Sequence, residues 1–197
     1  MPPKKQKAKS DNRRTVDRRV KRTRDSLGDA LVALIQERKF EDITVQDVLD
    51  RAGVGRSTFY VHYRDKEDLF LSDVEEFLEL ISNGIKRHAP NSKRLLPVQE
   101  FFTHLQDVRE FYFALVKSGK AKEVETLGRG IFARSIEERL LSAGVKMDDA
   151  ERSAHAHALA GSFFSLLEWW IDKGMKEDPR RMDEIFHRMA WSGLADG

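Results

Sequence analysis

The 197-residue sequence predicts an all-α fold of about nine helices, and three observations support this prediction. Apolar residues recur at three- and four-residue spacings along most of the chain, which is the period of a helix. No segment of the sequence shows the strict apolar and polar alternation of a half-buried strand. Several glycines and prolines fall between the periodic segments, where they end or separate helices, namely Gly53, Pro90, Gly119, Gly144, Gly174 and Pro179.

Composition limits the kinds of site that the chain can form. Hydrophobic residues make up 40% and charged residues 35% of the sequence, enough for a core and for solubility. The chain has no cysteine, so disulfides and thiolate metal sites are excluded, which fits a reducing cytoplasm. No apolar run reaches the ~18 residues of a membrane span, and the basic start lacks the apolar segment of a secretory signal. We therefore expect a cytoplasmic protein with no membrane partner.

Positive charge is concentrated in the first 24 residues. They hold eleven Lys or Arg and two acidic residues, +11 − 2 = +9, so the remainder of the chain carries +2 − 9 = −7. Residues 1–14 have no large aliphatic side chain and are expected to be disordered when free. This basic arm is interpreted either as a solubilising or cloning-derived tail, or as an arm that lies along DNA phosphates or in the minor groove. Composition does not decide between the two.

The first helix is predicted at about 16–38, because its apolar residues follow one helical stripe. The second half of this helix is expected to pack on the next two helices, with Phe40 and Ile43 closing a small core. The apolar positions of the stripe are 16, 20, 27, 31, 34 and 35.

Residues 44–66 predict two short helices joined by a tight turn. Thr44 and Asp47 can form a capping box at the start of the first helix. Gly53 can end that helix, because glycine adopts a positive φ without strain. A second short helix is expected over Arg56–Tyr63. Two helices joined by a glycine turn form the helix-turn-helix pattern, whose second helix enters the DNA major groove.

Phe59 is expected to anchor the second helix in the core, which leaves its other side chains to face DNA. Arginine can bond a guanine edge through two hydrogen bonds, and hydroxyl or imidazole groups can reach phosphates. The alternative is a helical hairpin with a solvated polar face. The side chains expected to face outward are Arg56, Ser57, Thr58, Tyr60, Val61 and His62, followed by Lys66 on the phosphate backbone.

A fourth helix at about 66–88 is long enough, at ~1.5 Å per residue, to span ~30 Å and to be shared by two domains. Pro90 prevents its continuation. We therefore divide the chain into a disordered arm at 1–14, a helix-turn-helix domain at 15–66 and a helical domain at 67–197. Later helices are predicted at about 95–106, 108–118, 120–142, 148–174 and 179–193.

The helical domain is rich in aromatic residues, which suit either a plain core or a pocket for an apolar or aromatic effector. His155 and His157 are two residues apart and point to different sides of a helix, so a shared metal is not expected. No glycine-rich phosphate loop, GxSxG, HExxH or cysteine nucleophile is present, so we expect no enzyme activity and no cofactor. The pocket candidates are Phe101, Phe102, Leu105, Phe111, Tyr112, Phe132 and Phe164.

The helix-turn-helix region resembles the TetR (tetracycline-repressor) family of transcription regulators. The sequence DRRVKRTRDSL at 17–27 and the segments 101–120 and 161–182 are similar to one subgroup of that family. The residues that carry the resemblance most specifically are Ile43–Val45, Arg51–Val54, Thr58–Tyr60, His62–Tyr63 and Lys66–Leu69.

The resemblance implies roles for particular residues. Family members contact DNA at the positions of Thr44 and Gln46 and along the recognition helix, here Arg56, Ser57, Thr58, Tyr60, Val61 and His62. Lys66 matches a lysine that contacts a phosphate. Gly55 stands where the family usually has a side-chain cap, a change that costs a few tenths of a kcal/mol.

The resemblance also implies a homodimer joined through its last two helices, here about 148–174 and 179–193. The segment 160–171 is apolar nearly all round, and such a helix is buried on more than one side. Its second side can face its own domain or a partner subunit. The dimer-interface candidates are Phe163, Leu166, Trp169, Trp170, Ile185, Phe186 and Met189.

These expectations describe a bacterial, nucleoid-associated regulator, a repressor released from a palindromic double-stranded DNA operator by a small effector. The alternative is a protein-partner module of the same fold, a coactivator or DNA-bound recruiter without an effector.

Overall fold

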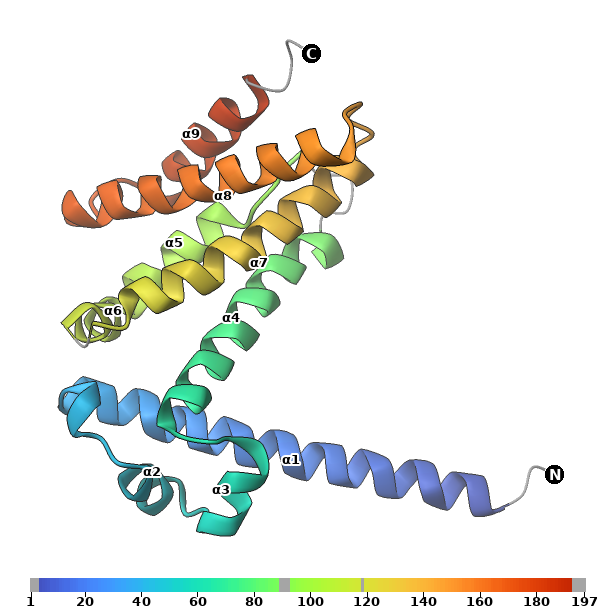
Figure 1. Cartoon of the computed structure of the whole chain (residues 1–197), viewed down its shortest axis with the longest axis vertical. Coiled ribbons are helices and arrows are strands. Elements are labelled where there is room, and N and C mark those ends of the chain that lie inside the picture. Colours follow the sequence, from blue (N-terminus) through green and yellow to red (C-terminus); the bar gives the residue numbers. More distant parts are fainter. Residues whose placement is uncertain (1–3, 89–92, 118, 193–197) are drawn as a thin grey trace. The chain divides into compact units, whose positions relative to one another are not determined.

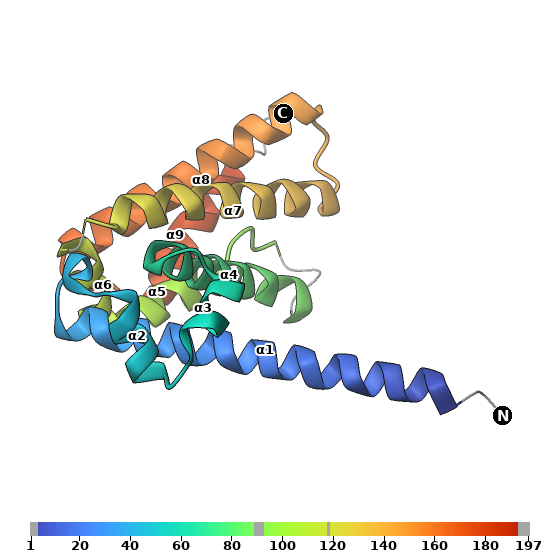
Figure 2. The same cartoon turned by 60° about the horizontal axis from the view of Figure 1, so that its bottom comes forward.

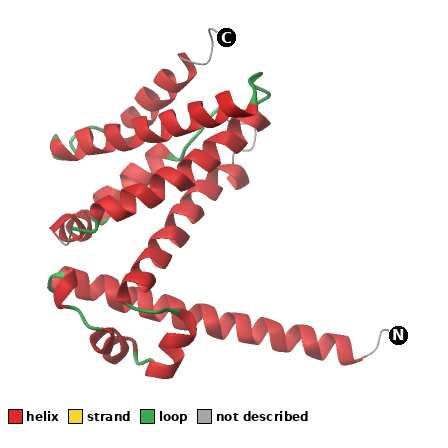
Figure 3. Ribbon diagram, in the orientation of Figure 1, coloured by secondary structure: helices red, strands yellow, loops and turns green. Residues whose placement is uncertain are grey.

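The computed structural model describes residues 4–88, 93–117 and 119–192, and every regular element in these ranges is helical (Figure 3). They contain nine α-helices and one short 3-10 helix, which confirms the predicted all-α class. None of the described helices has both the length and the apolar composition needed to cross a lipid bilayer. The chain divides into two compact units, Met1–Asp73 and Val74–Gly197, and the division falls inside helix α4 (Lys66–His88).

The first unit contains α1 (Lys4–Glu37), η1 (Phe40–Asp42), α2 (Val45–Ala52), α3 (Arg56–His62) and the start of α4. Helices α2 and α3 lie against the second half of α1, and the first half of α1 extends beyond them (Figures 1 and 2). The core of this unit is made by Leu27, Leu31, Leu34, Ile35, Phe40, Ile43, Val48, Leu49, Phe59, Tyr63, Leu69 and Phe70.

Helix α1 begins at Lys4, whereas the sequence predicted a disordered arm at 1–14 and a helix from about 16. Residues 4–14 contain no proline or glycine, and most of them are lysine, arginine, alanine or glutamine, which favour helix. The prediction treated the lack of an apolar stripe as evidence for disorder. In the structure the backbone continues the helix without such a stripe.

The second unit contains the rest of α4 with α5 (Val98–Asp107), α6 (Arg109–Lys117), α7 (Ala121–Ser142), α8 (Asp149–Asp172) and α9 (Pro179–Ser192). These bounds lie within three residues of the predicted ones. Helix α7 packs along α8, and α5 packs along α9. Gly128 of α7 faces Phe164 of α8, and a Cβ at this position would lie 2.5 Å from the ring. Glycine therefore permits the close approach of α7 and α8.

The core of the second unit is an aromatic cluster centred on Phe163 of α8, which is fully buried. Most of the rings around it meet it edge to face, the arrangement that the charge distribution of aromatic rings favours. Five ring centroids lie 5.0 to 6.0 Å from that of Phe163, namely those of Phe101, Phe102, Phe132, Phe164 and Phe186.

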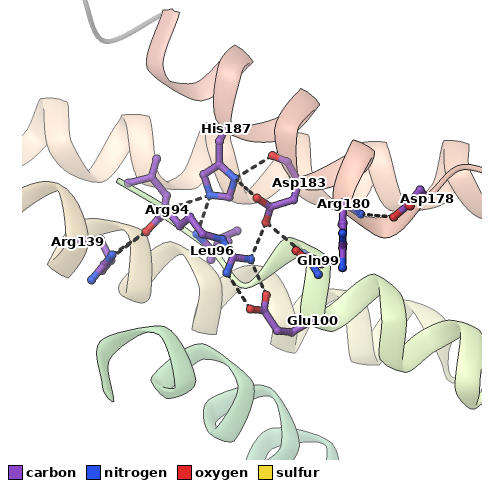
Figure 4. Close-up of polar contacts among 10 residues, drawn as sticks. Arg94, Leu96, Gln99, Glu100, Arg139, Asp178, Arg180, Asp183 and His187 are labelled. Carbon is purple, nitrogen blue, oxygen red and sulfur yellow. Dashed lines mark hydrogen bonds and ion pairs between the residues drawn. The ribbon is translucent and has the colours of Figure 1, made fainter. Parts of the chain in front are cut away.

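A polar network fastens the segment before α5 to α7 and α9 (Figure 4). The Arg94 guanidinium donates to Asp183 Oδ1 at 2.6 Å and to both carboxylate oxygens of Glu100. The buried Arg139 donates through Nε and Nη2 to the Arg94 carbonyl at 3.1 and 2.9 Å. Asp183 also accepts the Gln99 N–H at 3.2 Å. Sequence reasoning did not find this network, because its hydrogen bonds join residues up to 92 positions apart.

The imidazole of His187 completes the network. Its Nε2 accepts the Leu95 N–H at 2.9 Å, so the ring proton lies on Nδ1, which donates to the Asp183 carbonyl at 2.9 Å. Burial raises the pKa of the Asp183 carboxyl, but hydrogen bonds from His187 and Arg94 outweigh it and hold that pKa below 3.8. The hydrogen bond from Arg94 likewise lowers the pKa of Glu100.

Replacing Asp183 with asparagine should destabilise the second unit at neutral pH by about 2 kcal/mol, because charge-assisted hydrogen bonds are lost. The folded-state pKa of Asp183 is lowered, so its contribution is present above the unfolded value near 3.8 and disappears as pH falls below it. Melting temperatures of the wild type should therefore drop more steeply below pH 4 than those of D183N. The exposed neighbour variant Glu184→Gln should follow the wild-type curve. Parallel curves for D183N and wild type would contradict this account.

Candidate nucleic-acid interface

Helix α2 begins with the predicted capping box. The Asp47 N–H donates to Thr44 Oγ1 at 3.2 Å, and Asp47 Oδ2 accepts the Thr44 N–H at 2.7 Å and its hydroxyl at 2.6 Å. These hydrogen bonds and the Arg38 guanidinium, 3.0 Å away, lower the pKa of Asp47 to about 2. The box therefore fixes the first turn of α2, where Thr44 and Gln46 are exposed.

The turn between α2 and α3 uses two glycines differently. Gly53 has φ 65° and ψ 32°, the left-handed conformation expected after a helix, and its N–H donates to the Leu49 carbonyl. Gly55 precedes α3 with an extended backbone, and its carbonyl accepts the N–H groups of Thr58 and Phe59. As expected, no side chain caps α3. The start of α3 therefore depends on backbone hydrogen bonds and on what the helix packs against.

Helix α3 buries Phe59 and exposes its other face. Phe59 has no exposed surface, and its ring centroid lies 5.7 Å from that of Tyr63. Tyr60 is 52% exposed and Val61 is 77% exposed. Such an exposed valine on a polar helix suits apolar contact with a thymine methyl group. The predicted outward residues Arg56, Ser57, Thr58, Tyr60 and Val61 are exposed, and His62 is half-buried.

The Lys66 ammonium contacts backbone carbonyls of its own unit. Its ammonium donates to the carbonyls of Phe40 at 2.7 Å, Glu41 at 3.1 Å and Ile43 at 2.6 Å. An ammonium has three N–H donors, and these three carbonyls use all of them. Lys66 therefore fastens the start of α4 to the segment before α2. The sequence did not indicate this contact, because it joins residues at least 23 positions apart.

Two arginines orient the helix-turn-helix on α1. Arg24 donates through Nε to the hydroxyl of Tyr63, the residue after α3, at 3.0 Å, and through Nη2 to the Ser72 hydroxyl at 3.3 Å. Arg51 near the end of α2 forms a bidentate pair with Glu37 at 2.6 and 2.8 Å. Both short helices are thus attached to the long helix by polar contacts as well as by the core.

The dimer-interface candidates separate into two sets. Phe163, Trp170 and Phe186 have no exposed surface in the single subunit, so they serve its own core, and the expectation for these three is corrected. Their burial has an intradomain cause, because all three belong to the aromatic cluster or touch it. Trp169 and Met189 are each 45% exposed, and Leu166 and Ile185 are half-buried.

Most of the effector-pocket candidates lie in the aromatic core. Phe101, Phe102 and Phe132 are buried and pack with Phe163, and Leu105 and Phe164 are only 8% exposed. The side chain of Phe111 lies outside the described residues. Tyr112 is half-buried, and its burial, followed by the carboxylates of Glu168, Asp172 and Glu125, raises the pKa of its hydroxyl. Within the described residues, no group of three His, Cys, Asp or Glu could hold a metal ion.

Two family models match the chain. Residues 27–72 match the model for bacterial regulatory proteins of the tetR family. Residues 97–191 match the model for a transcriptional regulator C-terminal region. The first match contains the whole helix-turn-helix, and the second contains all the helices from α5 to α8 and most of α9.

Known proteins of the same kind are similar over most of the chain. The uncharacterized HTH-type transcriptional regulator YxbF of Bacillus subtilis (strain 168) is 24% identical over 182 residues, which cover 89% of this chain and 46% of that protein. The chain thus spans about half the length of this relative. A TetR transcriptional regulator from Streptococcus agalactiae 2603V gives a TM-score of 0.62 at 24% identity, covering 89% of this chain and 97% of the other. The dihydroxyacetone kinase operon activator DhaS gives a TM-score of 0.62 at 16% identity, and the match covers 88% of this chain and 96% of the other. These structural similarities establish the fold.

Replacing Lys66 with methionine should destabilise the first unit by about 2 to 3 kcal/mol, because three carbonyls, two of them in partly buried hydrogen bonds, lose a charged donor. Urea unfolding of the full chain measures this change. Lys39→Met, at an exposed lysine of the same unit, is the matched control and should leave the unfolding free energy within ~0.5 kcal/mol of wild type. If Lys66→Met kept wild-type stability and lost only affinity for DNA, the phosphate-contact role would be the correct one.

Proposed function

The chain belongs to the tetR family of bacterial regulatory proteins, and on this premise we propose that it is a homodimeric, sequence-specific DNA-binding regulator of transcription. The observation that carries the proposal is the outer face of α3. Phe59 holds this seven-residue helix in the core, while Tyr60 and Val61 stand 52% and 77% exposed. A helix presented in this way can enter the ~12 Å wide major groove.

The proposed DNA contacts divide by chemistry. Arg56 is the candidate for bidentate hydrogen bonds to a guanine, and Val61 for contact with a thymine methyl group. The hydroxyl, amide and imidazole groups would bind phosphates or base edges, since these groups are common in both kinds of contact. They belong to Thr44 and Gln46 at the start of α2 and to Ser57, Thr58, Tyr60 and His62 on α3.

We further propose that the dimer forms through apolar residues of α8 and α9 that the single subunit leaves exposed or half-buried. Leu166 and Trp169 lie three residues apart on α8, and Ile185 and Met189 lie four apart on α9, so each pair shares a helix face. A two-fold interface brings the same patch from both subunits together. The dimer would then read a palindromic operator whose half-sites are one or more helical turns apart.

The proposed mode of regulation is repression, which a small apolar or aromatic effector relieves. The proposed location is the nucleoid in the cytoplasm. The effector would bind among the aromatic residues of the second unit, next to the half-buried Tyr112 hydroxyl. Helix α4 belongs to both units and is the continuous element along which a change could pass. The effector can shift the dimer only if it binds the released form more tightly than the DNA-bound form.

The alternative function is a protein-partner module, a coactivator or recruiter that needs no effector. Helix α6 supports it, because Phe113 and Val116 are 38% and 44% exposed. A neighbour of the same fold is named as an operon activator, so the fold is compatible with activation. Partner capture that Phe113→Ser and Val116→Ser abolish, together with operator binding that no small molecule changes, would favour this alternative.

Selection of bound sequences from random double-stranded DNA should return a palindrome for the purified wild type. Arg56→Ala should weaken the free energy of DNA binding by about 1 to 3 kcal/mol, because a bidentate contact is lost. It should also relax the base preference at one base pair. Tyr60→Ala should weaken binding to all sequences alike. Arg134→Ala, at an exposed arginine of α7, is the control and should change neither result. Wild-type affinity in the Arg56→Ala, Tyr60→Ala double variant would refute the assignment of α3.

Trp169→Glu should convert the dimer to monomers, because two carboxylates would be buried at the two-fold axis. Sedimentation at micromolar concentration measures the change, and the affinity for the palindrome should fall with it. Leu141→Glu introduces the same charge at a position that is 63% exposed, at the end of α7, and should remain dimeric. A dimeric Trp169→Glu variant would place the interface on another surface.

A further inference from the structure

The two halves of α1 differ in what they contact. The second half supplies the core of the first unit, beginning with Leu27, which is fully buried. Before Arg24, the described side chains are largely exposed, and only Val20 and Thr23 are half-buried. Arg18, Arg19, Lys21 and Arg22 are all exposed. Figures 1 and 2 show this first half of α1 extending beyond α2 and α3.

The first half of α1 also concentrates positive charge. Residues 4–14 carry +6 − 1 = +5 and residues 15–24 carry +5 − 1 = +4, whereas the chain as a whole carries +2. Basic residues recur every fourth position in two rows, at 5, 9 and 13 and at 14, 18 and 22. Like charges four residues apart destabilise a helix, so a polyanion that neutralises them would stabilise this one. The charge pattern therefore indicates an anionic partner.

Arg24, where the two halves of α1 meet, is hydrogen-bonded to the residue that follows the recognition helix. Arg24 donates to the hydroxyl of Tyr63 at 3.0 Å, and Tyr63 directly follows α3. Arg24 also donates to the Ser72 hydroxyl at 3.3 Å, which links the first part of α4 to the same point of α1. The orientation of the basic first half of α1 is thus fixed relative to the end of α3. A partner of α3 is therefore the nearest polyanion for this half.

We propose that Lys4–Arg24 is a second DNA-binding element, which contacts the phosphate backbone of the duplex that flanks the half-site contacted by α3. This proposal rests on the function proposed above, because it needs α3 to hold the duplex. The segment is 21 residues long and spans about 30 Å, or about nine base pairs. An α-helix is about 10 to 12 Å wide and the minor groove about 6 Å, so the helix follows phosphates and does not enter that groove.

The test uses the full chain and the palindrome obtained by selection. Arg18→Gln, Arg19→Gln and Arg22→Gln are combined in one variant, since these side chains are exposed and glutamine keeps the helix propensity. The control variant combines Lys122→Gln, Arg134→Gln and Arg188→Gln, which remove the same charge from exposed positions of the second unit. Affinity is measured against salt concentration on the palindrome alone and on the palindrome with ten added base pairs of arbitrary sequence at each end.

The wild type and the control should bind the longer duplex more tightly and with a steeper salt dependence. The triple arginine variant should lose that gain. The slope of its log affinity against log salt concentration should be shallower than that of wild type by up to about 2.7 per subunit. This difference corresponds to about a 40-fold change in relative affinity between 50 and 200 mM salt. Equal slopes and equal flank gains for this variant and wild type would overturn the proposal. So would a loss of affinity as large on the palindrome alone as on the longer duplex. If the wild type binds no DNA at all, the proposed function itself fails.

Discussion

A helix of seven residues is not stable in water by itself, and the proposed DNA-reading element of this protein, α3, has that length. Its position therefore depends on contacts made by other elements. Phe59 fills the core below it, Gly53 turns the chain into it, and Tyr63 at its end is bonded to Arg24 of α1. Lys66 then fixes the first turn of α4 to the segment before α2. The first unit is best understood as a support for one short helix.

The same need for support explains why so many charged groups in this unit point at protein atoms. Arg51 pairs with Glu37, Arg38 with Asp47, and Lys66 with three carbonyls. Charges used in this way orient the elements of the unit. The residues proposed to contact DNA instead lie on α3, at the start of α2 and on the first half of α1, and most of those with a described side chain are exposed. Charge alone would not separate these two groups, because both contain lysine or arginine.

The second unit combines a packed aromatic core with a polar network that holds α5, α7 and α9 around the 93–96 segment. Rings at 5.0 to 6.0 Å from Phe163 are in contact, so an apolar effector would have to displace some of them. Displacement of such rings is a discrete change that helices packed on them can follow. The half-buried Tyr112, at the edge of this core, offers the polar group that would orient such a ligand.

The sequence by itself determined the features that depend on neighbours in the chain. The capping box of Thr44 and Asp47, the left-handed Gly53, the buried Phe59 and the bounds of the helices after α1 follow from patterns a few residues long. Tertiary structure decided which residues of an apolar helix face inward. It separates buried Trp170 from exposed Trp169, although both lie in one apolar run. It also places the Lys66 ammonium against the Phe40 carbonyl and brings Arg94 to Asp183 in the polar network. These features join residues tens of positions apart, and no local pattern records such contacts.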